Sequence, residues 1–424
     1  MNKKFLKNTS WIIFDKIFQM ILGLFVSTWS ARYLGPSNMG TISYVSSFIT
    51  LFSAITALGL NNVIIKELIE HKDSEGEVLG TAIVLRLASA LVTSVMVLFL
   101  ISILNDGDHL IIMITLLESI MLIAQSFEML IYWYQSRLES KVTSIIQTIA
   151  YVAVSAYKLY GLVTQKDVIW FAFATSLETI VIAIMLLVSY KRNEGQKFGF
   201  KKVLAKEMIS ISHHFIYLGI MVSIYNQMDS IMIKGWMNEW AVGQYSIATG
   251  INTMWSFIIQ AIIDSAYPLI VELKKKENDE KYLLGVKKLY CIVFWISFIA
   301  CVLITVFAKF IILTLYGTEY IPATMTLRIC TWSVIFSFLG VARNVWMICE
   351  NNQKYQKYIL GIGCVVNLVL NSLLIPHYGY NGATLATLVT QIVTSYVAPL
   401  FFKATRKNTI LITEALNPMI LFRK

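Results

Sequence analysis

Charged residues are scarce in this chain of 424 residues, where they make up 14% of the sequence. Typical globular proteins contain roughly 25%. A soluble chain of this length folds into several domains, and each domain needs a charged surface. Here hydrophobic residues reach 57% instead, and the mean hydropathy is +0.67. The composition therefore excludes an ordinary soluble protein and predicts a protein with many membrane spans.

Motifs for nucleotide-driven, metal-dependent and redox chemistry are also missing. The sequence contains no GxxxxGK[ST] phosphate loop, no HExxH and no CxxC pair. The five cysteines are dispersed within apolar stretches, which is typical of small packing side chains and not of disulfides. We therefore expect a protein that moves a substrate, with no enzymatic activity, no metal and no cofactor apart from a coupling proton or sodium ion.

The hydrophobic residues gather in twelve stretches, each long enough to cross the hydrocarbon core as a helix of ~20 residues. They are too long for barrel strands and lack the alternation of such strands. The predicted fold is an all-α integral membrane protein with twelve transmembrane helices at about 9–31, 41–64, 80–103, 110–134, 142–160, 168–190, 212–234, 244–268, 289–316, 324–349, 357–375 and 382–402.

Lysine and arginine are distributed unevenly between the two sides of these spans. With the N-terminus inside, the cytoplasmic segments hold roughly five times as many as the outer side, which predicts that both termini are cytoplasmic. The net charge of +10 then reflects basic residues at the anionic inner leaflet and no nucleic-acid partner. The outer side is expected to hold Arg32, Lys158, Lys166, Lys234 and Lys309.

A basic linker at about 191–211 follows the sixth predicted span and divides the chain at its middle. We expect an N-terminal six-helix lobe at 1–190, a C-terminal six-helix lobe at 212–402 and a cytoplasmic tail at 403–424. Two patterns recur in both halves, MGTISY against VGQYS and ATSL against ATLV. Since each copy has an even number of spans, both insert in the same direction, and a substrate path is expected between them.

Ionisable side chains inside the predicted spans are candidates for a wet cavity, because each costs at least ~2.5–3.5 kcal/mol to insert. Glu128, Glu178 and Asp229 lie deepest, and we interpret them as cavity residues. Span four carries Glu118 on roughly the same stripe as Glu128. Near the cytoplasmic edge, an interfacial ion pair or a snorkelling side chain is the alternative interpretation. The complete set of candidates is Asp15, Lys16, Arg86, Glu128, Glu178, Tyr225, Asn226, Asp229, Gln260, Asp264 and Arg343.

The chemistry of these candidates suits a polar, sugar-like cargo. Amides and hydroxyls bond sugar hydroxyls, and aromatic faces stack on sugar rings. An arginine such as Arg86 or Arg343 can hold a phosphate by two parallel hydrogen bonds.

Two stretches resemble the signatures of a known family, namely ARYLGPSNMGTISYVSSF at 31–48 and HYGYNGATLATLVTQ at 377–391. They are similar to those of polysaccharide-export flippases, the O-antigen or Wzx-type transporters. This family shares a superfamily with multidrug and toxin extrusion (MATE) antiporters and lipid II flippases. Within the two stretches, the glycines at Gly35–Pro36 and at 379–382 are expected to supply tight turns at helix starts.

The resemblance implies a MATE-like fold of two six-helix lobes and a cavity formed mainly by helices one, two, seven and eight. It implies that an undecaprenyl-pyrophosphate-linked oligosaccharide moves from the inner to the outer leaflet of the bacterial plasma (inner) membrane. The process served is O-antigen, lipopolysaccharide or other surface polysaccharide biosynthesis. The polysaccharide polymerase and chain-length regulator of that pathway are the expected protein partners.

Two other functions stay open. A cation-coupled multidrug exporter of the same fold would use Asp15 as its cation site, although the adjacent Lys16 would neutralise that charge. A membrane-embedded polymerase or ligase would act on the same lipid-linked sugar. Such an enzyme needs a folded outer loop, whereas no predicted outer loop exceeds roughly fifteen residues, in line with packed helix connections.

Overall fold

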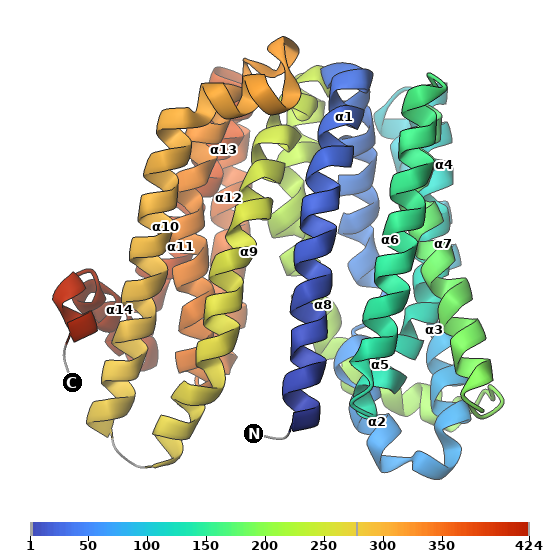
Figure 1. Ribbon diagram of the computed structural model, residues 1–424, viewed down its shortest axis with the longest axis horizontal. Coiled ribbons are helices and arrows are strands. Elements are labelled where there is room, and N and C mark those ends of the chain that lie inside the picture. The colour runs from blue at the N-terminus through green and yellow to red at the C-terminus, as the bar shows by residue number, and fades with distance from the viewer. Residues whose placement is uncertain (1–2, 277–278, 423–424) are drawn as a thin grey trace. The chain divides into compact units, whose positions relative to one another are not determined.

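The computed structural model describes residues 3–276 and 279–422, and side chains within these ranges except at 3–17, 62 and 422. All regular structure in the described ranges is helical (Figure 1). The chain forms two compact units, Met1–Gln227 and Met228–Lys424. The division that the sequence predicts at 191–211 stays a prediction.

Eleven helices of the described residues are long and apolar enough to cross a membrane. The first, Phe18–Thr56, contains a break at Gly35, whose φ of 71° and ψ of 171° only glycine adopts readily. Pro36 follows and restarts the helix without needing a backbone N–H. The predicted all-α multi-span fold is confirmed, while the number of twelve spans and the side of the termini stay predictions.

The first unit contains α1 (Lys3–Thr56), α2 (Ile64–Glu70), α3 (Glu75–Leu104), α4 (His109–Ala124), α5 (Met129–Ser136), α6 (Ser140–Val163), α7 (Val168–Arg192) and most of α8 (Lys202–Trp236). Helix α1 packs on α3, α4 and α6, and α7 packs on α4 and α6. An apolar core gathers at one end around Trp133, Tyr134 and Tyr190, and it includes Leu204 and Met208 from the start of α8.

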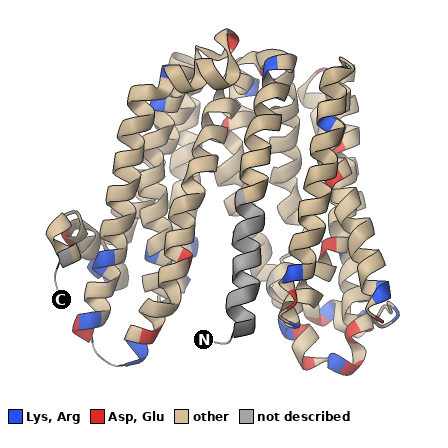
Figure 2. Ribbon diagram, viewed as in Figure 1, with Lys and Arg blue, Asp and Glu red and all other residues tan. Residues whose placement is uncertain are grey.

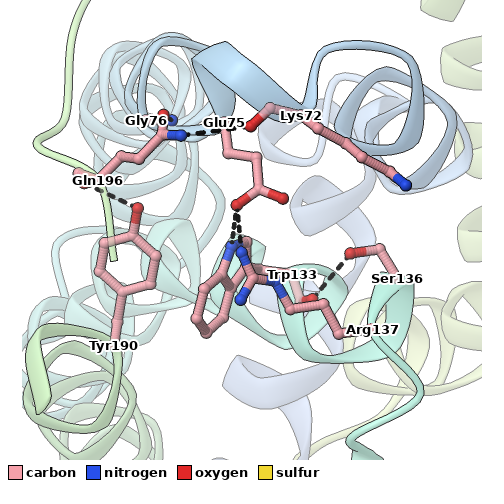
Figure 3. A network of polar contacts seen from close by, with 8 residues as sticks. All are labelled: Lys72, Glu75, Gly76, Trp133, Ser136, Arg137, Tyr190 and Gln196. Carbon is pink, nitrogen blue, oxygen red and sulfur yellow. Dashed lines mark hydrogen bonds and ion pairs between the residues drawn. The ribbon is translucent and has the colours of Figure 1, made fainter. Parts of the chain in front are cut away.

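The connection between α7 and α8, residues 193–201, lies against the first turns of α3 (Figure 3). The Gln196 side chain accepts the N–H of Gly76 at 3.0 Å and donates to the Lys72 carbonyl at 3.2 Å. The Glu75 carboxylate accepts from Trp133 Nε1 at 2.8 Å and Arg137 Nη2 at 2.6 Å. The two bonds of Gln196 attach the connection to α3 and the turn before it, and the Glu75 bonds join α3 to the end of α5.

The second unit contains the end of α8 followed by α9 (Glu239–Lys275), α10 (Asp279–Tyr316), α11 (Ala323–Cys349), α12 (Gln356–Tyr378), α13 (Tyr380–Ile392) and α14 (Lys403–Ala415). Helix α11 packs on α9, α10 and α13, and α12 packs on α13. Gly379, with a φ of 59°, forms the expected turn between α12 and α13. The five cysteines are free thiols.

Two predicted spans differ in detail from the observed helices. The stretch 41–64 is not one helix, because α1 ends at Thr56 and Leu58 and Gly59 adopt positive φ angles. The stretch 382–402 is α-helical only to Ile392, and one π turn and one 3₁₀ turn containing Pro399 complete it. Both departures occur where glycine or proline interrupts the helical hydrogen bonds.

Helix α14 occupies part of the segment expected to be a cytoplasmic tail. It packs on α10 beside the bundle (Figure 1), with Leu411 and Ile412 buried. Asn408 Nδ2 donates to the Tyr290 hydroxyl at 2.5 Å, which fixes the helix to α10.

Candidate functional site

A buried carboxylate, Asp229 on α8, lies at the centre of a polar cluster in the second unit. Its side chain is inaccessible, with the residue 4% exposed. The Tyr245 hydroxyl donates to Oδ2 at 2.6 Å, Asn371 Nδ2 donates to Oδ1 at 2.7 Å, and the Thr387 hydroxyl also donates to Oδ2. These donors come from α9, α12 and α13. Within the described residues, no basic side chain forms an ion pair with Asp229.

The local sequence explains how three helices approach one carboxylate. Asn367 and Asn371 are one turn apart on the buried face of α12, and Asn371 Nδ2 also donates to Asn367 Oδ1 at 3.0 Å. Small residues dominate the buried face of α13, and a Cβ at Gly382 would lie 2.3 Å from the Leu374 carbonyl oxygen. Small residues let membrane helices pack closely enough for side-chain hydrogen bonds between them.

A cavity of about 190 Å³ borders this cluster, and Tyr245 and Thr387 belong to both. Most of the residues that line it, from α9, α11 and α13, carry a hydroxyl or an amide group, although the apolar parts of the side chains supply more of its surface; these residues are Thr249, Asn252, Thr253, Ser256, Ser333, Ser337, Thr384 and Gln391. The two shared hydroxyls therefore connect the cavity to the carboxylate. This arrangement can bind a small polar group.

The first unit brings three of the predicted residues near one another, namely Arg86, Glu128 and Glu178. Arg86 is 4% exposed, donates to Asn61 Oδ1 at 3.5 Å and interacts electrostatically with Glu128. Glu128 in turn interacts with Glu178. Figure 2 shows charged residues part-way along the helices of this unit as well as at its ends. The prediction that these side chains face a wet cavity stays a prediction.

The other candidates are distributed over α1, α8, α9 and α11. Gln260 Nε2 donates to Asp264 Oδ1 at 2.8 Å, so these two pair along α9, with Asp264 exposed. Arg343 is buried on α11 and donates Nη1 to the Thr394 carbonyl at 2.6 Å, within the irregular end of the last span. Tyr225 and Asn226 lie on α8 in the first unit. The side chains of Asp15 and Lys16 lie outside the described residues.

The sequence analysis did not select three residues that bind Asp229. Tyr245, Asn371 and Thr387 are neutral, so a search for charges inside spans passes over them. The pair Asn367 and Asn371, spaced by one helical turn within an apolar stretch, is the signal that would have pointed to them.

Lys158 is a further charged residue that the candidate set left out. The charge count assigns it to the outer side, which stays a prediction. Lys158 lies within α6, which continues to Val163, on the same face as the buried Val154 and Gly161. This face meets the charged interior of the first unit, because Lys158 interacts electrostatically with Glu178 and Glu118.

Comparison with solved structures confirms the expected fold. The chain is similar to the lipid II flippase MurJ in an inward closed conformation, with a TM-score of 0.77, 14% identity, and coverage of 98% of this chain and 92% of that one. It is similar to an inward-facing MATE family multidrug transporter of the MOP superfamily, with a TM-score of 0.72, 14% identity, and coverage of 93% and 96%. At such identities the likeness concerns the fold alone.

Curated relatives are distant. An uncharacterised membrane protein of Methanocaldococcus jannaschii is 23% identical over 229 residues, which are 51% of this chain and 45% of the relative. The chain thus spans less than half of that protein. A probable low-salt glycan biosynthesis flippase of Haloferax volcanii is 22% identical over 366 residues, covering 85% of this chain and 75% of the relative.

The family comparison covers more of the sequence than the first of these relatives does. Residues 5–274, which are more than half of the chain, match the family described as polysaccharide biosynthesis protein. The matched region includes the first unit and extends through α8 and nearly all of α9, so it contains Asp229 and Tyr245. This multi-span helical membrane protein therefore belongs to the polysaccharide biosynthesis protein family.

Proposed function

We propose that this protein is a flippase that moves a lipid-linked oligosaccharide across a membrane during polysaccharide biosynthesis. The family match supports this function, as does the likeness to a glycan biosynthesis flippase over most of the chain. The relatives are named as flippases and transporters and not as enzymes. The specific cargo is an oligosaccharide on undecaprenyl pyrophosphate, moved from the inner to the outer leaflet of a bacterial plasma membrane for O-antigen or another surface polysaccharide. A polysaccharide polymerase and a chain-length regulator are the proposed protein partners.

One structural observation carries the proposal, namely the hydroxyl- and amide-lined cavity beside Asp229. A sugar presents many hydroxyl groups that both donate and accept hydrogen bonds, and such a wall can satisfy them in the same way. A cavity for an apolar drug would need mainly hydrophobic and aromatic lining, because an apolar ligand leaves polar wall groups without partners.

We also propose that Asp229 couples transport to protons or to sodium. A buried carboxylate that has only neutral donors is stable as an anion only while those donors remain in place. A proton or a small monovalent cation relieves the same requirement. Since Tyr245 and Thr387 border the cavity and donate to Asp229, occupancy of the carboxylate changes the groups that face the cargo.

The alternative function is cation-coupled export of drugs, which the likeness to a MATE family transporter favours. The hydroxyl- and amide-bearing residues that line the cavity argue for the glycan. The two functions differ in phenotype, since overexpression of a drug exporter raises drug resistance and overexpression of a glycan flippase does not.

A complementation experiment tests the proposal. The gene is deleted in its host and replaced by the wild type, by Asp229→Asn or by the control Asp73→Asn, whose carboxylate is exposed. We expect wild type and control to restore surface polysaccharide, and Asp229→Asn to reduce it at least tenfold with normal amounts of protein in the membrane. Wild-type polysaccharide with Asp229→Asn would remove Asp229 from the proposal, and normal polysaccharide after the deletion itself would overturn the flippase function.

A further inference from the structure

A second cavity, with a volume of about 600 Å³, lies in the first unit and takes no part in the site around Asp229. Residues of α4, α6 and α7 line it together with the connection between α6 and α7. Sites that bind small molecules in proteins usually measure ~300–1,000 Å³. We call this cavity the α6–α7 groove.

The α6–α7 groove is polar at its mouth and apolar further in. Residues 164–167 form the mouth, and all four are exposed. Leu117, Ile169 and Phe173 line the inner part. Leu117 comes eight residues after His109, where α4 begins, which corresponds to about 12 Å at a rise of ~1.5 Å per residue. The groove therefore extends from the ends of the helices into the part of the bundle that spans the hydrocarbon.

Large apolar side chains are exposed beside the α6–α7 groove. Leu116 adjoins Leu117 along α4, and Tyr160 lies on α6 with its ring 5.8 Å from that of Trp170. Exposed apolar surface on a membrane-spanning helix marks contact with the membrane. A lipid chain is therefore the occupant that the surroundings supply to the inner part of the groove.

Lys166 and Asp167 place two opposite charges at the mouth of the groove. Among the described residues, neither side chain forms an ion pair, and the two do not pair with each other. Asp167 precedes α7, at the position where a carboxylate usually accepts the first N–H groups of a helix, but its side chain makes no such hydrogen bond. Both charges are therefore available to a ligand.

Trp170 gives the Lys166 ammonium a defined place. The indole stacks on Tyr157, with ring centroids 4.2 Å apart and planes 9° apart, and the Lys166 Nζ lies over the indole at 5.7 Å from its centroid. Because Tyr157 covers one face of the indole, the ammonium lies over the other face. Asp167, Trp170 and Phe173 follow at intervals of three residues and share one face of α7. Along this face the groove presents a carboxylate, then an ammonium, then an apolar ring.

We propose that the α6–α7 groove binds a phospholipid with a zwitterionic headgroup, namely phosphatidylethanolamine. Its phosphate accepts from the Lys166 ammonium, its amine donates to the Asp167 carboxylate, and one of its chains lies against Phe173. A headgroup with a net negative charge would leave Asp167 beside a like charge. A sugar ring would find both faces of Trp170 covered. The lipid is not the proposed cargo, so the inference goes beyond the proposed function and does not depend on it.

Photocrosslinking of the purified full-length protein in detergent tests the groove without any glycan. The probe is phosphatidylethanolamine with a diazirine in one chain, and mass spectrometry of the digested protein measures the labelling of the peptides that contain Leu117 and Phe173. Unlabelled phosphatidylethanolamine should compete for these peptides at about one tenth of the concentration that phosphatidylglycerol with the same chains requires, because phosphatidylglycerol has no amine for Asp167. Equal competition by the two lipids would overturn the proposal, as would labelling confined to other parts of the protein.

Charge variants test the two ends of the headgroup separately. Lys166→Ala should lower the labelling of the groove about tenfold, whereas the control Lys309→Ala, at an exposed lysine of α10, should leave it unchanged. Asp167→Asn should let phosphatidylglycerol compete as well as phosphatidylethanolamine does. Its control Asp106→Asn, at an exposed acid in the connection 105–108, should keep the wild-type preference. Wild-type labelling of Lys166→Ala together with wild-type competition in Asp167→Asn would contradict the proposal.

Discussion

One buried carboxylate in each unit determines the chemistry of the polar side chains around it. Asp229 and Glu118 are buried carboxylates, and each lies among donors that belong to other helices. Intramembrane carboxylates of this kind usually mark a functional site, because a chain without a use for them would be easier to insert without them.

Removal of the Tyr245 hydroxyl tests how much its hydrogen bond to Asp229 contributes to stability. Tyr245→Phe keeps the ring and removes one donor at 2.6 Å from the carboxylate. We expect the free energy of unfolding to fall by about 1–3 kcal/mol, since a hydrogen bond to a charged group is lost. Thermal unfolding of the purified protein measures the change, and Tyr378→Phe, at a residue 61% exposed, serves as the control. An unchanged melting temperature would mean that Tyr245 does not stabilise the carboxylate.

We expect the stability of the protein to depend on pH through Glu67, which lies on the short helix α2, outside the candidate spans. Burial raises the pKa of this carboxyl, and the neighbouring His71, 3.5 Å from Oε2, opposes the shift. The pKa of Glu67 in the folded protein lies above the unfolded value of about 4.3, because the fold favours the protonated carboxyl. Its contribution to the free energy of unfolding is therefore fully present below that pH and is lost as the pH rises through the folded pKa.

Glu67→Gln should remove this dependence and make the protein more stable than the wild type at neutral pH. Melting temperatures across a pH series measure both effects. Glu70→Gln is the control, because Glu70 is an exposed partner of Lys66. Equal pH profiles for wild type and Glu67→Gln would contradict the raised pKa.

At the scale of elements, the connection 193–201 behaves as a structural part of the first unit. A Cβ at Gly76 would lie 2.3 Å from the Lys197 carbonyl oxygen, a backbone atom that cannot move independently. We therefore expect Gly76→Ala to lower the free energy of unfolding by about 1–3 kcal/mol. The matched control is Gly361→Ala on α12, where nothing lies within 4 Å of the added Cβ.

That control should leave stability unchanged or raise it by up to about 1 kcal/mol, because alanine favours a helix over glycine. Chemical denaturation of the two variants in the same detergent compares them directly. Equal stabilities of Gly76→Ala and Gly361→Ala would show that the connection 193–201 can move to accommodate a side chain at position 76.

The sequence predicts helices better than it predicts their ends. Apolar stretches of sufficient length locate the spans because the bilayer requires helical segments of that length. The break at Gly35 and the turn at Gly379 were also predictable, since glycine permits backbone angles that other residues avoid. Thr56 was missed as a helix end because the residues that follow it remain apolar.

The candidate site was predictable only in part, for a geometric reason. Asp229 was identified because a charge inside a span is rare. Its donors Tyr245 and Thr387 are 16 and 158 residues away along the chain and carry no charge, so only the packing of the helices brings them to the carboxylate. Lys158 was left out of the candidates because its position near the end of a span resembles that of a loop residue.

At the scale of the whole molecule, the family, the multi-span fold and the polar cavity are all consistent with the movement of a glycan across a membrane. Transport without chemistry means that the cargo leaves unchanged. In the proposed function, the substrate and the product therefore differ only in the leaflet they occupy.

The sidedness of the lipid-linked oligosaccharide tests this central claim most directly. The gene is deleted, and the lipid-linked sugars in inverted and right-side-out vesicles are probed with a reagent that does not cross the membrane. We expect oligosaccharide of full length to accumulate on the cytoplasmic leaflet, with a bare cell surface, and mass spectrometry of the accumulated lipid then identifies the cargo. An unchanged distribution between the leaflets, with normal surface polysaccharide, would contradict the account.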